Sequence, residues 1–212
     1  MTKSLVLGAA LATAFTSTAA FADVTANIGV ASQYFWRGIT LSAPAPQVSG
    51  GVDYAHDSGF YAGVWTSSEG LYGGPETDFY AGFGGEVEGI SYDIGFISYQ
   101  YLQAESLGYG TNQDFEEIYF GLGYGPVSFS YANDSDNETD YITLSGEFEG
   151  ITLTYGSYAF DLDSTLDYTH IDIAYALTDE LSIMYSTPDF DDATVIDDPS
   201  VIIMYGLEFD LK

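Results

Sequence analysis

Near the end of the 212-residue chain, residues 200–211 have the sequence SVIIMYGLEFDL. Every second position from Val201 to Leu211 carries a large apolar side chain, and the positions between include Met204, Gly206, Glu208 and Asp210. A period of two places successive side chains on opposite faces of a β-strand. The segment therefore predicts a strand with one apolar face and one small or acidic face.

The same alternation recurs along the chain, for example at 90–96, 118–124 and 171–177. It predicts twelve strands, at about 24–37, 46–56, 60–69, 77–87, 90–102, 114–125, 127–133, 139–148, 151–161, 166–177, 180–187 and 200–211. Tight turns such as DSG at 57–59 and EG at 88–89 alternate with longer segments such as PDFDDATVIDDP at 188–199. Short periplasmic turns and longer extracellular loops are typical of a transmembrane antiparallel up-and-down β-barrel.

A soluble β-sandwich is the alternative all-β fold. Greek-key connections give it no reason to keep short and long connections in strict alternation. Its core would also have to accept the acidic strand face, and unpaired buried carboxylates are too costly for a dry core. We therefore predict a barrel whose apolar face meets lipid and whose acidic face lines a watery lumen. The acidic lumen candidates are Asp53, Asp78, Asp93, Glu117, Asp172, Glu208 and Asp210.

The N-terminus has the features of a secretory signal peptide. Lys3 precedes an apolar run from Ser4 to Phe15, and Ala20-Phe21-Ala22 offers a cleavage site between small residues. The run is shorter than the roughly 20 apolar residues that span a bilayer as a helix. We predict that residues 1–22 are cleaved, that 23–212 form the barrel, and that the protein resides in the outer membrane of a Gram-negative cell.

The charge of the chain limits its partners. Lys and Arg number 3 against 32 Asp and Glu, and removal of 1–22 would leave 2 basic side chains. Such a surface repels nucleic acid, because almost no cation is present to neutralise phosphate. The chain also has no cysteine, which excludes disulfides and thiolate metal sites.

Three segments carry a family resemblance. SQYFWRGI at 32–39, PAPQ at 44–47 and DYAHDSGFYAGVWTS at 53–67 resemble the TorF-type porin family of Gram-negative bacteria. The resemblance is dense over about 27–102 and implies an exported outer-membrane protein of the porin class, with no catalytic residues to carry over. GLEFDL at 206–211 is similar to the C-terminal signal read by the barrel assembly machinery, although the chain ends on Lys212 instead of an aromatic residue.

Arg37 is the one basic side chain between Lys3 and Lys212. Strand parity predicts that it faces the lumen, where a guanidinium should find a carboxylate to bind with two hydrogen bonds. The same parity turns Tyr34 and Trp36 toward lipid, as part of an aromatic girdle at the outer interface. Two interpretations of Arg37 stay open: a constriction or latch that holds the loop at 38–45, and a structural ion pair that relieves repulsion between acids.

The acidic lumen indicates a porin-like channel for passive diffusion of small hydrophilic solutes, with a preference for cations. General acidity as a solubility trait of salt-adapted organisms would explain the composition equally well. Twelve strands lie between the eight that enclose only side chains and the sixteen that enclose an aqueous channel, so an open and a plugged lumen are both consistent. A non-conducting structural, adhesion or surface-receptor barrel is the second class of function.

We expect no resident cofactor, and partners limited to outer-membrane lipid, lipopolysaccharide, the assembly machinery and small solutes. Two acidic loop clusters offer carboxylates for weak Ca²⁺ or Mg²⁺ binding, which could bridge to lipopolysaccharide phosphates. They are Asp134, Asp136, Glu138 and Asp140, and Asp189, Asp191, Asp192, Asp197 and Asp198. An outer-membrane hydrolase would need His56 or His170 as its base, and their predicted places in a periplasmic turn and in the lumen favour no enzyme.

Overall fold

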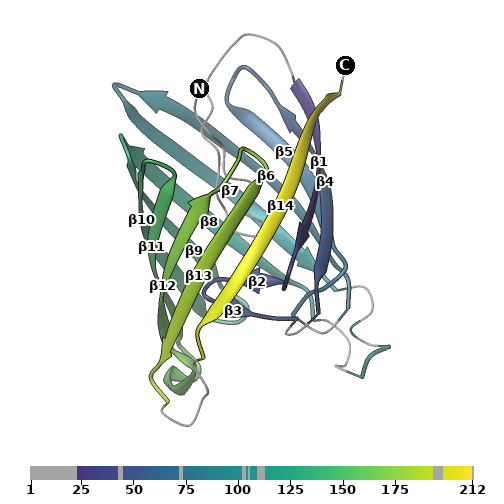
Figure 1. Cartoon of the computed structure of the whole chain (residues 1–212), viewed down its shortest axis with the longest axis vertical. Helices are drawn as coiled ribbons and strands as arrows, with labels where there is room; N and C mark the ends of the chain where they lie inside the picture. Colours follow the sequence, from purple (N-terminus) through teal and green to yellow (C-terminus); the bar gives the residue numbers. More distant parts are fainter. Residues whose placement is uncertain are drawn as a thin grey trace.

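A computed structural model describes residues 23–42, 45–71, 74–101, 104, 106–108, 113–192 and 198–211; the predicted signal peptide at 1–22 lies outside them. The described residues form a closed barrel of twelve antiparallel strands (Figure 1), which confirms the predicted fold class. The wall strands are β1 (Asp23–Ala31), β4 (Gln47–Ala55), β5 (Phe60–Ser67), β6 (Glu76–Val87), β7 (Ile90–Gln100), β8 (Phe115–Tyr124), β9 (Val127–Asp134), β10 (Thr139–Phe148), β11 (Ile151–Phe160), β12 (Tyr168–Ala176), β13 (Leu181–Phe190) and β14 (Ser200–Leu211).

The barrel closes where β14 pairs with β1, from Val24 opposite Leu211 to Ala31 opposite Met204. The alternating sequence that predicted this strand corresponds to side chains that point alternately outward and inward. Val201 and Ile203 are about half exposed on the outside, whereas Ile202 and Met204 are buried inside. Because closure pairs the last strand with the first, the sheet has no free edge to expose unpaired backbone groups.

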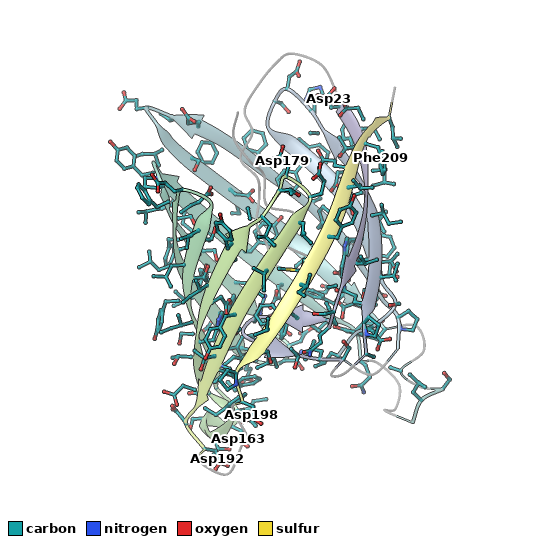
Figure 2. All side chains as sticks on the ribbon, in the orientation of Figure 1. Asp23, Asp163, Asp179, Asp192, Asp198 and Phe209 are labelled. Carbon is teal, nitrogen blue, oxygen red and sulfur yellow. The ribbon has the colours of Figure 1, made fainter. Side chains whose placement is uncertain are left out.

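The two ends of the barrel differ as predicted. Residues 56–59, 88–89, 125–126, 149–150 and 177–180 make the short connections, and we call this side the turn end. Glu88-Gly89 and Glu149-Gly150 have φ near +50° and +80°, the two positive angles of a type I′ hairpin turn. Asp23, where β1 begins, and Phe209, close to the end of β14, lie at the turn end together with Asp179 (Figure 2).

The other side, which we call the loop end, carries the longer connections. One of them contains a 3-10 turn, η1 (Ser164–Leu166), and Figure 2 shows Asp163, Asp192 and Asp198 together at this end. The described residues contain no helix with the length and apolar character needed to cross a membrane.

The predicted first strand at 24–37 is wrong in its second half. β1 ends at Ala31, and the chain then turns into the barrel to form a separate two-stranded hairpin, β2 (Phe35–Trp36) and β3 (Ile39–Thr40). Figure 1 shows β2 and β3 inside the barrel, close to the loop end. We call Phe35–Thr40 the interior hairpin. Its connection, Arg37-Gly38, has φ of 49° and 88°, so it is another type I′ turn.

Several inward glycines make room for aromatic rings that lie against the barrel wall. Gly63 is directly opposite Tyr80, and a Cβ on Gly63 would overlap the Tyr80 ring. Gly95 stands in the same relation to Tyr119 across β7 and β8. Each ring covers the backbone of the glycine opposite it. It therefore lies along the wall instead of extending into the lumen.

Candidate functional site

A buried ion pair joins the interior hairpin to the barrel wall. The Arg37 guanidinium donates through Nη1 to Glu117 Oε1 (2.7 Å) and through Nη2 to Oε2 (2.6 Å). Both side chains are almost fully buried, at 5% and 1% exposure. Tyr99 of the adjacent strand donates a third hydrogen bond to the carboxylate, at 3.0 Å. Parallel hydrogen bonds between the two planar groups fix orientation as well as charge.

Aromatic rings enclose the same guanidinium. Its Cζ atom lies 4.4 Å from the ring centroid of Trp36, 4.4 Å from that of Tyr141 and 5.3 Å from that of Tyr158. A cation over the face of a ring is attracted by the ring quadrupole, and desolvation strengthens the attraction. Because Arg37 is buried, these contacts replace the water that the guanidinium gives up.

The hairpin backbone is also fixed to the opposite wall. The Tyr168 hydroxyl donates to the Arg37 carbonyl (2.9 Å), and the Ser186 hydroxyl donates to the Gly38 carbonyl (3.0 Å). A Cβ on Gly38 would overlap the His170 ring, so glycine is needed there for close approach as well as for positive φ. The turn is therefore held by β8 on one side and by β12 and β13 on the other.

Tyr34 and Trp36 do not form part of a lipid-facing girdle, and that prediction is wrong. Tyr34 is 1% exposed and donates to Glu76 Oε1 at 2.5 Å, while Trp36 packs edge-on against Tyr158. The parity argument assumed that the wall strand continues to Arg37. It leaves the wall after Ala31, so both aromatic side chains are carried into the lumen with the hairpin.

An aromatic cluster fills the interior around the hairpin at the loop end. The buried apolar residues packed together there are Trp36, Ile97, Tyr99, Tyr101, Ala104, Phe115, Tyr119, Ala132, Tyr158 and Tyr168. On the other side, Phe35 packs against Ala174, Met184, Ile202 and Met204. These two groups of side chains therefore pack against the hairpin from both sides and fill the space between it and the wall.

Two buried carboxylates of β6 lie close to the hairpin. Glu76 and Asp78 are 1% and 5% exposed, and Glu76 Oε2 and Asp78 Oδ1 have no hydrogen-bond partner among the described residues. Glu76 Oε1 receives the Tyr34 hydroxyl. A buried carboxylate oxygen without a donor is costly unless a proton or a cation compensates it. This part of the lumen consequently disfavours additional negative charge.

Other acidic side chains named from the sequence line the lumen with hydroxyl partners. Asp93 accepts a hydrogen bond from Tyr61 (2.8 Å to Oδ1), and Tyr61 in turn contacts the Tyr119 hydroxyl. Asp53 accepts from Tyr80 and from Asn27, the latter at 3.1 Å. The hydroxyls hold each carboxylate in place without neutralising its charge.

Glu208 and Asp210 lie nearer the turn end. They share the inward face of β14 with Met204, opposite Asn27 and Thr25 of β1, and both are exposed. The structure does not bring them together with Arg37 or Glu117.

The two histidines are in different places. His170 is 2% exposed on β12, where Nδ1 lies 3.0 Å from Asp172 Oδ1 and Nε2 lies 2.8 Å from the Tyr141 hydroxyl. Asp172, another predicted lumen residue, thus contacts the His170 ring, which packs against Gly38 of the hairpin turn. His56 is in an exposed turn, with Nδ1 2.9 Å from the Ser58 hydroxyl and 3.1 Å from the Ser58 backbone nitrogen.

The acidic loops are partly engaged in their own turns. Asp134 accepts from the backbone N–H groups of Asp136 and Asn137 and from the Asn137 side chain. Asp163 accepts from the backbone and hydroxyl of Thr165, which lowers the pKa of the Asp163 carboxyl. Over the described residues no three acidic or histidine side chains are placed to share a metal ion, and Asp197 lies outside those residues.

Two solved structures of the KdgM porin support the fold. The KdgM porin covers 89% of this chain over 99% of its own length, with a TM-score of 0.53 at 10% identity. KdgM porin in complex with disordered oligogalacturonate gives a TM-score of 0.51 at 8% identity, with 90% and 99% covered. A mutant of the Rh. blastica porin gives 0.43 at 10% identity, also with 90% and 99% covered.

Among curated proteins, none is significantly similar in sequence. The resemblance to TorF-type porins stays a prediction. A bacterial family profile does match residues 15–175, which is most of the chain. The chain therefore belongs to the family described as "Bacterial protein of unknown function (Gcw_chp)".

Proposed function

We propose that the protein is an outer-membrane channel for passive diffusion of small hydrophilic solutes, in which the interior hairpin narrows the lumen. The observation that carries the proposal is the inside-out barrel. Large apolar side chains such as Phe79, Ile118 and Leu153 are more than half exposed on the outside, while carboxylates line the inside. An apolar outer band with a polar interior is the pattern of barrels that span a bilayer. The turn end would face the periplasm and the loop end the exterior.

We propose further that the channel prefers cations. Arg37 is the only Lys or Arg among the described residues, and Glu117 already neutralises it. The remaining lumen carboxylates, including Asp53 and Asp93, leave an excess of negative charge along the route. Fixed charge of one sign in a narrow pore concentrates the opposite ion. An anionic chain such as the oligogalacturonate named with KdgM would be repelled by this lumen.

The outer surface supports a role for divalent cations at the loop end. Glu116 and Asp140 are carboxylates on the outward face of the wall near that end. Lipopolysaccharide phosphates facing them would require a bridging cation, since no basic side chain is present among the described residues there. We therefore retain weak Ca²⁺ or Mg²⁺ bridging as part of the proposal.

One observation favours the second candidate, a non-conducting structural or receptor barrel. The interior hairpin and the aromatic cluster around it are buried, so in this conformation they leave little space for a solute to pass near the loop end. A channel would then require the hairpin to move. The catalytic alternative has less support, because His56 sits in a turn at one end and His170 has both ring nitrogens engaged inside.

Planar-bilayer recording of the purified protein tests the proposal. In a KCl gradient we expect discrete channels whose reversal potential has the sign of K⁺ selectivity over Cl⁻. Absence of channels, from protein shown to be folded by heat-dependent gel mobility, would contradict the channel function. Channels with an anion-selective reversal potential would contradict only the cation preference.

A further inference from the structure

The wall around Arg37 provides a carboxylate and aromatic rings that contact its guanidinium. We define the Arg37 pocket as Tyr99 of β7, Glu117 of β8, Tyr141 of β10 and Tyr158 of β11. All four residues belong to wall strands, and none belongs to the interior hairpin. The pocket would therefore keep its carboxylate and its rings if the hairpin moved away.

We propose that the Arg37 pocket is a binding site for guanidinium-type organic cations, and that Arg37 is a tethered occupant which such a solute displaces. Two oxygens of Glu117 receive the two terminal nitrogens of Arg37 at 2.7 and 2.6 Å. A free alkylguanidinium presents the same pair of N–H donors. It can reproduce these contacts without the rest of the arginine residue.

The rings explain why a planar organic cation is favoured over a metal ion. The Tyr141 and Tyr158 ring centroids lie 4.4 and 5.3 Å from the guanidinium carbon, so the planar cation is in contact with aromatic rings. A small metal ion would gain one carboxylate and lose most of its hydration shell. Guanidinium is weakly hydrated and stacks on aromatic rings, so it loses less hydration free energy when it enters the pocket.

The pocket also discriminates against neutral isosteres. Glu117 is 1% exposed, and the hydroxyl of Tyr99 supplies only one hydrogen bond toward its charge. A neutral molecule such as urea would leave a buried carboxylate without a counter-charge, which is strongly unfavourable. Binding should consequently require positive charge as well as planar donors.

As a statement about permeating solutes, the inference rests on the proposed channel function, whereas binding can be measured without conduction. Displacement of Arg37 by a solute would remove the attachment of the turn to β8 and leave it held by the weaker, uncharged hydrogen bonds from Tyr168 and Ser186. A solute could then open its own route past the interior hairpin. This would be a population shift between two hairpin positions, driven by competition for one site.

The test uses the Arg37→Ala variant in a Trp65→Phe background, which leaves Trp36 as the single tryptophan. Trp36 reports on the pocket because its ring lies 4.4 Å from the Arg37 Cζ atom. Titration with ethylguanidinium should give a saturable change in fluorescence and a higher melting temperature. Adding Glu117→Gln should weaken the apparent affinity by at least about tenfold, because the charged hydrogen bonds are lost. Urea at equal concentration should give neither signal.

Binding that survives Glu117→Gln, or an equal response to urea, would overturn the proposal. If Arg37→Ala does not fold, the wild-type protein still decides the question. Hydrogen exchange at the Leu41 amide, which donates to the Tyr34 carbonyl at 2.8 Å, should then rise with ethylguanidinium and not with urea. An unchanged rate would count against displacement. Channels without ethylguanidinium binding would refute this inference alone, and binding without channels would refute the channel function alone.

Discussion

Replacing Glu117 with glutamine should release the interior hairpin. The variant keeps the size of the side chain but leaves the Arg37 guanidinium without a counter-charge at 5% exposure. Breaking a buried, hydrogen-bonded ion pair on one side typically costs about 3–5 kcal/mol. The guanidinium can escape this cost by leaving the pocket and entering water. We therefore expect displacement of the hairpin, with the barrel wall intact.

The size of the effect follows from that cost. Since about 1.4 kcal/mol changes an equilibrium tenfold, about 3 kcal/mol would raise the displaced population by roughly a hundredfold. The cation–π contacts with Tyr141 and Tyr158 of the wall remain in the variant and oppose release. The hydrogen bonds from Tyr168 and Ser186 to the hairpin backbone also remain and oppose it. In planar bilayers the expected result is a higher open probability, or a larger conductance, than in the wild-type protein. Acrylamide quenching of tryptophan should also increase, because Trp36 becomes accessible.

Glu116→Gln is the matched control. It makes the same chemical change at the adjacent residue of β8, on the exposed outer face. Conductance and quenching should stay at the wild-type level in this variant. Unchanged conductance and unchanged quenching in Glu117→Gln, with folding verified, would refute the idea that the ion pair holds the hairpin.

Three further outcomes follow from the packing. Gly38→Ala should loosen the hairpin in the same assays, because alanine disfavours φ of 88° by about 1 kcal/mol and its Cβ would overlap His170. Gly63→Ala should lower the barrel melting temperature by displacing the Tyr80 ring, whereas Gly146→Ala, with no atom within 4 Å of the added Cβ, should leave it unchanged. Asp93→Asn should reduce cation preference in the reversal potential without changing the fold, and an unaltered potential would remove Asp93 from the conduction path.

The barrel could be predicted from the sequence because two local signals agree along the whole chain. The period of two predicts which side chains face outward and which face inward. Turn residues such as Glu88-Gly89 and Glu149-Gly150 predict where one strand ends and the next begins. These signals depend on neighbours in the chain, which a single sequence displays directly. The predicted strand boundaries therefore differ from the structure by only a few residues in most of the wall.

The interior hairpin could not be predicted by the same reasoning. An alternating segment in the lumen has the same pattern as one in the wall, and only contacts with distant strands distinguish them. One signal was available: Arg37-Gly38 has the form of Glu88-Gly89, the two-residue connection of a hairpin. The inward direction of Arg37 was predicted from strand parity, although the strand does not continue that far. Its partner Glu117, 80 residues away, was one of several equivalent acids.

The lumen glycines were missed for a related reason. Gly63 and Gly95 appear in the sequence as breaks in a strand pattern, and their role depends on which ring lies across from them. Once the register is known, each has an aromatic residue as its direct partner. Register between strands is set by the whole closed sheet, so it was not accessible from either strand alone.

If the proposed channel function holds, the interior hairpin, and not the barrel wall, limits passage through this protein. The decisive experiment compares single-channel conductance of the wild-type protein with a variant in which residues 33–42 are replaced by a short Gly-Ser linker. We predict a larger, steadier and still cation-selective conductance in the variant, because twelve strands without a plug leave room for water. Equal conductance in the two proteins, or no channel in either, would contradict this role of the hairpin.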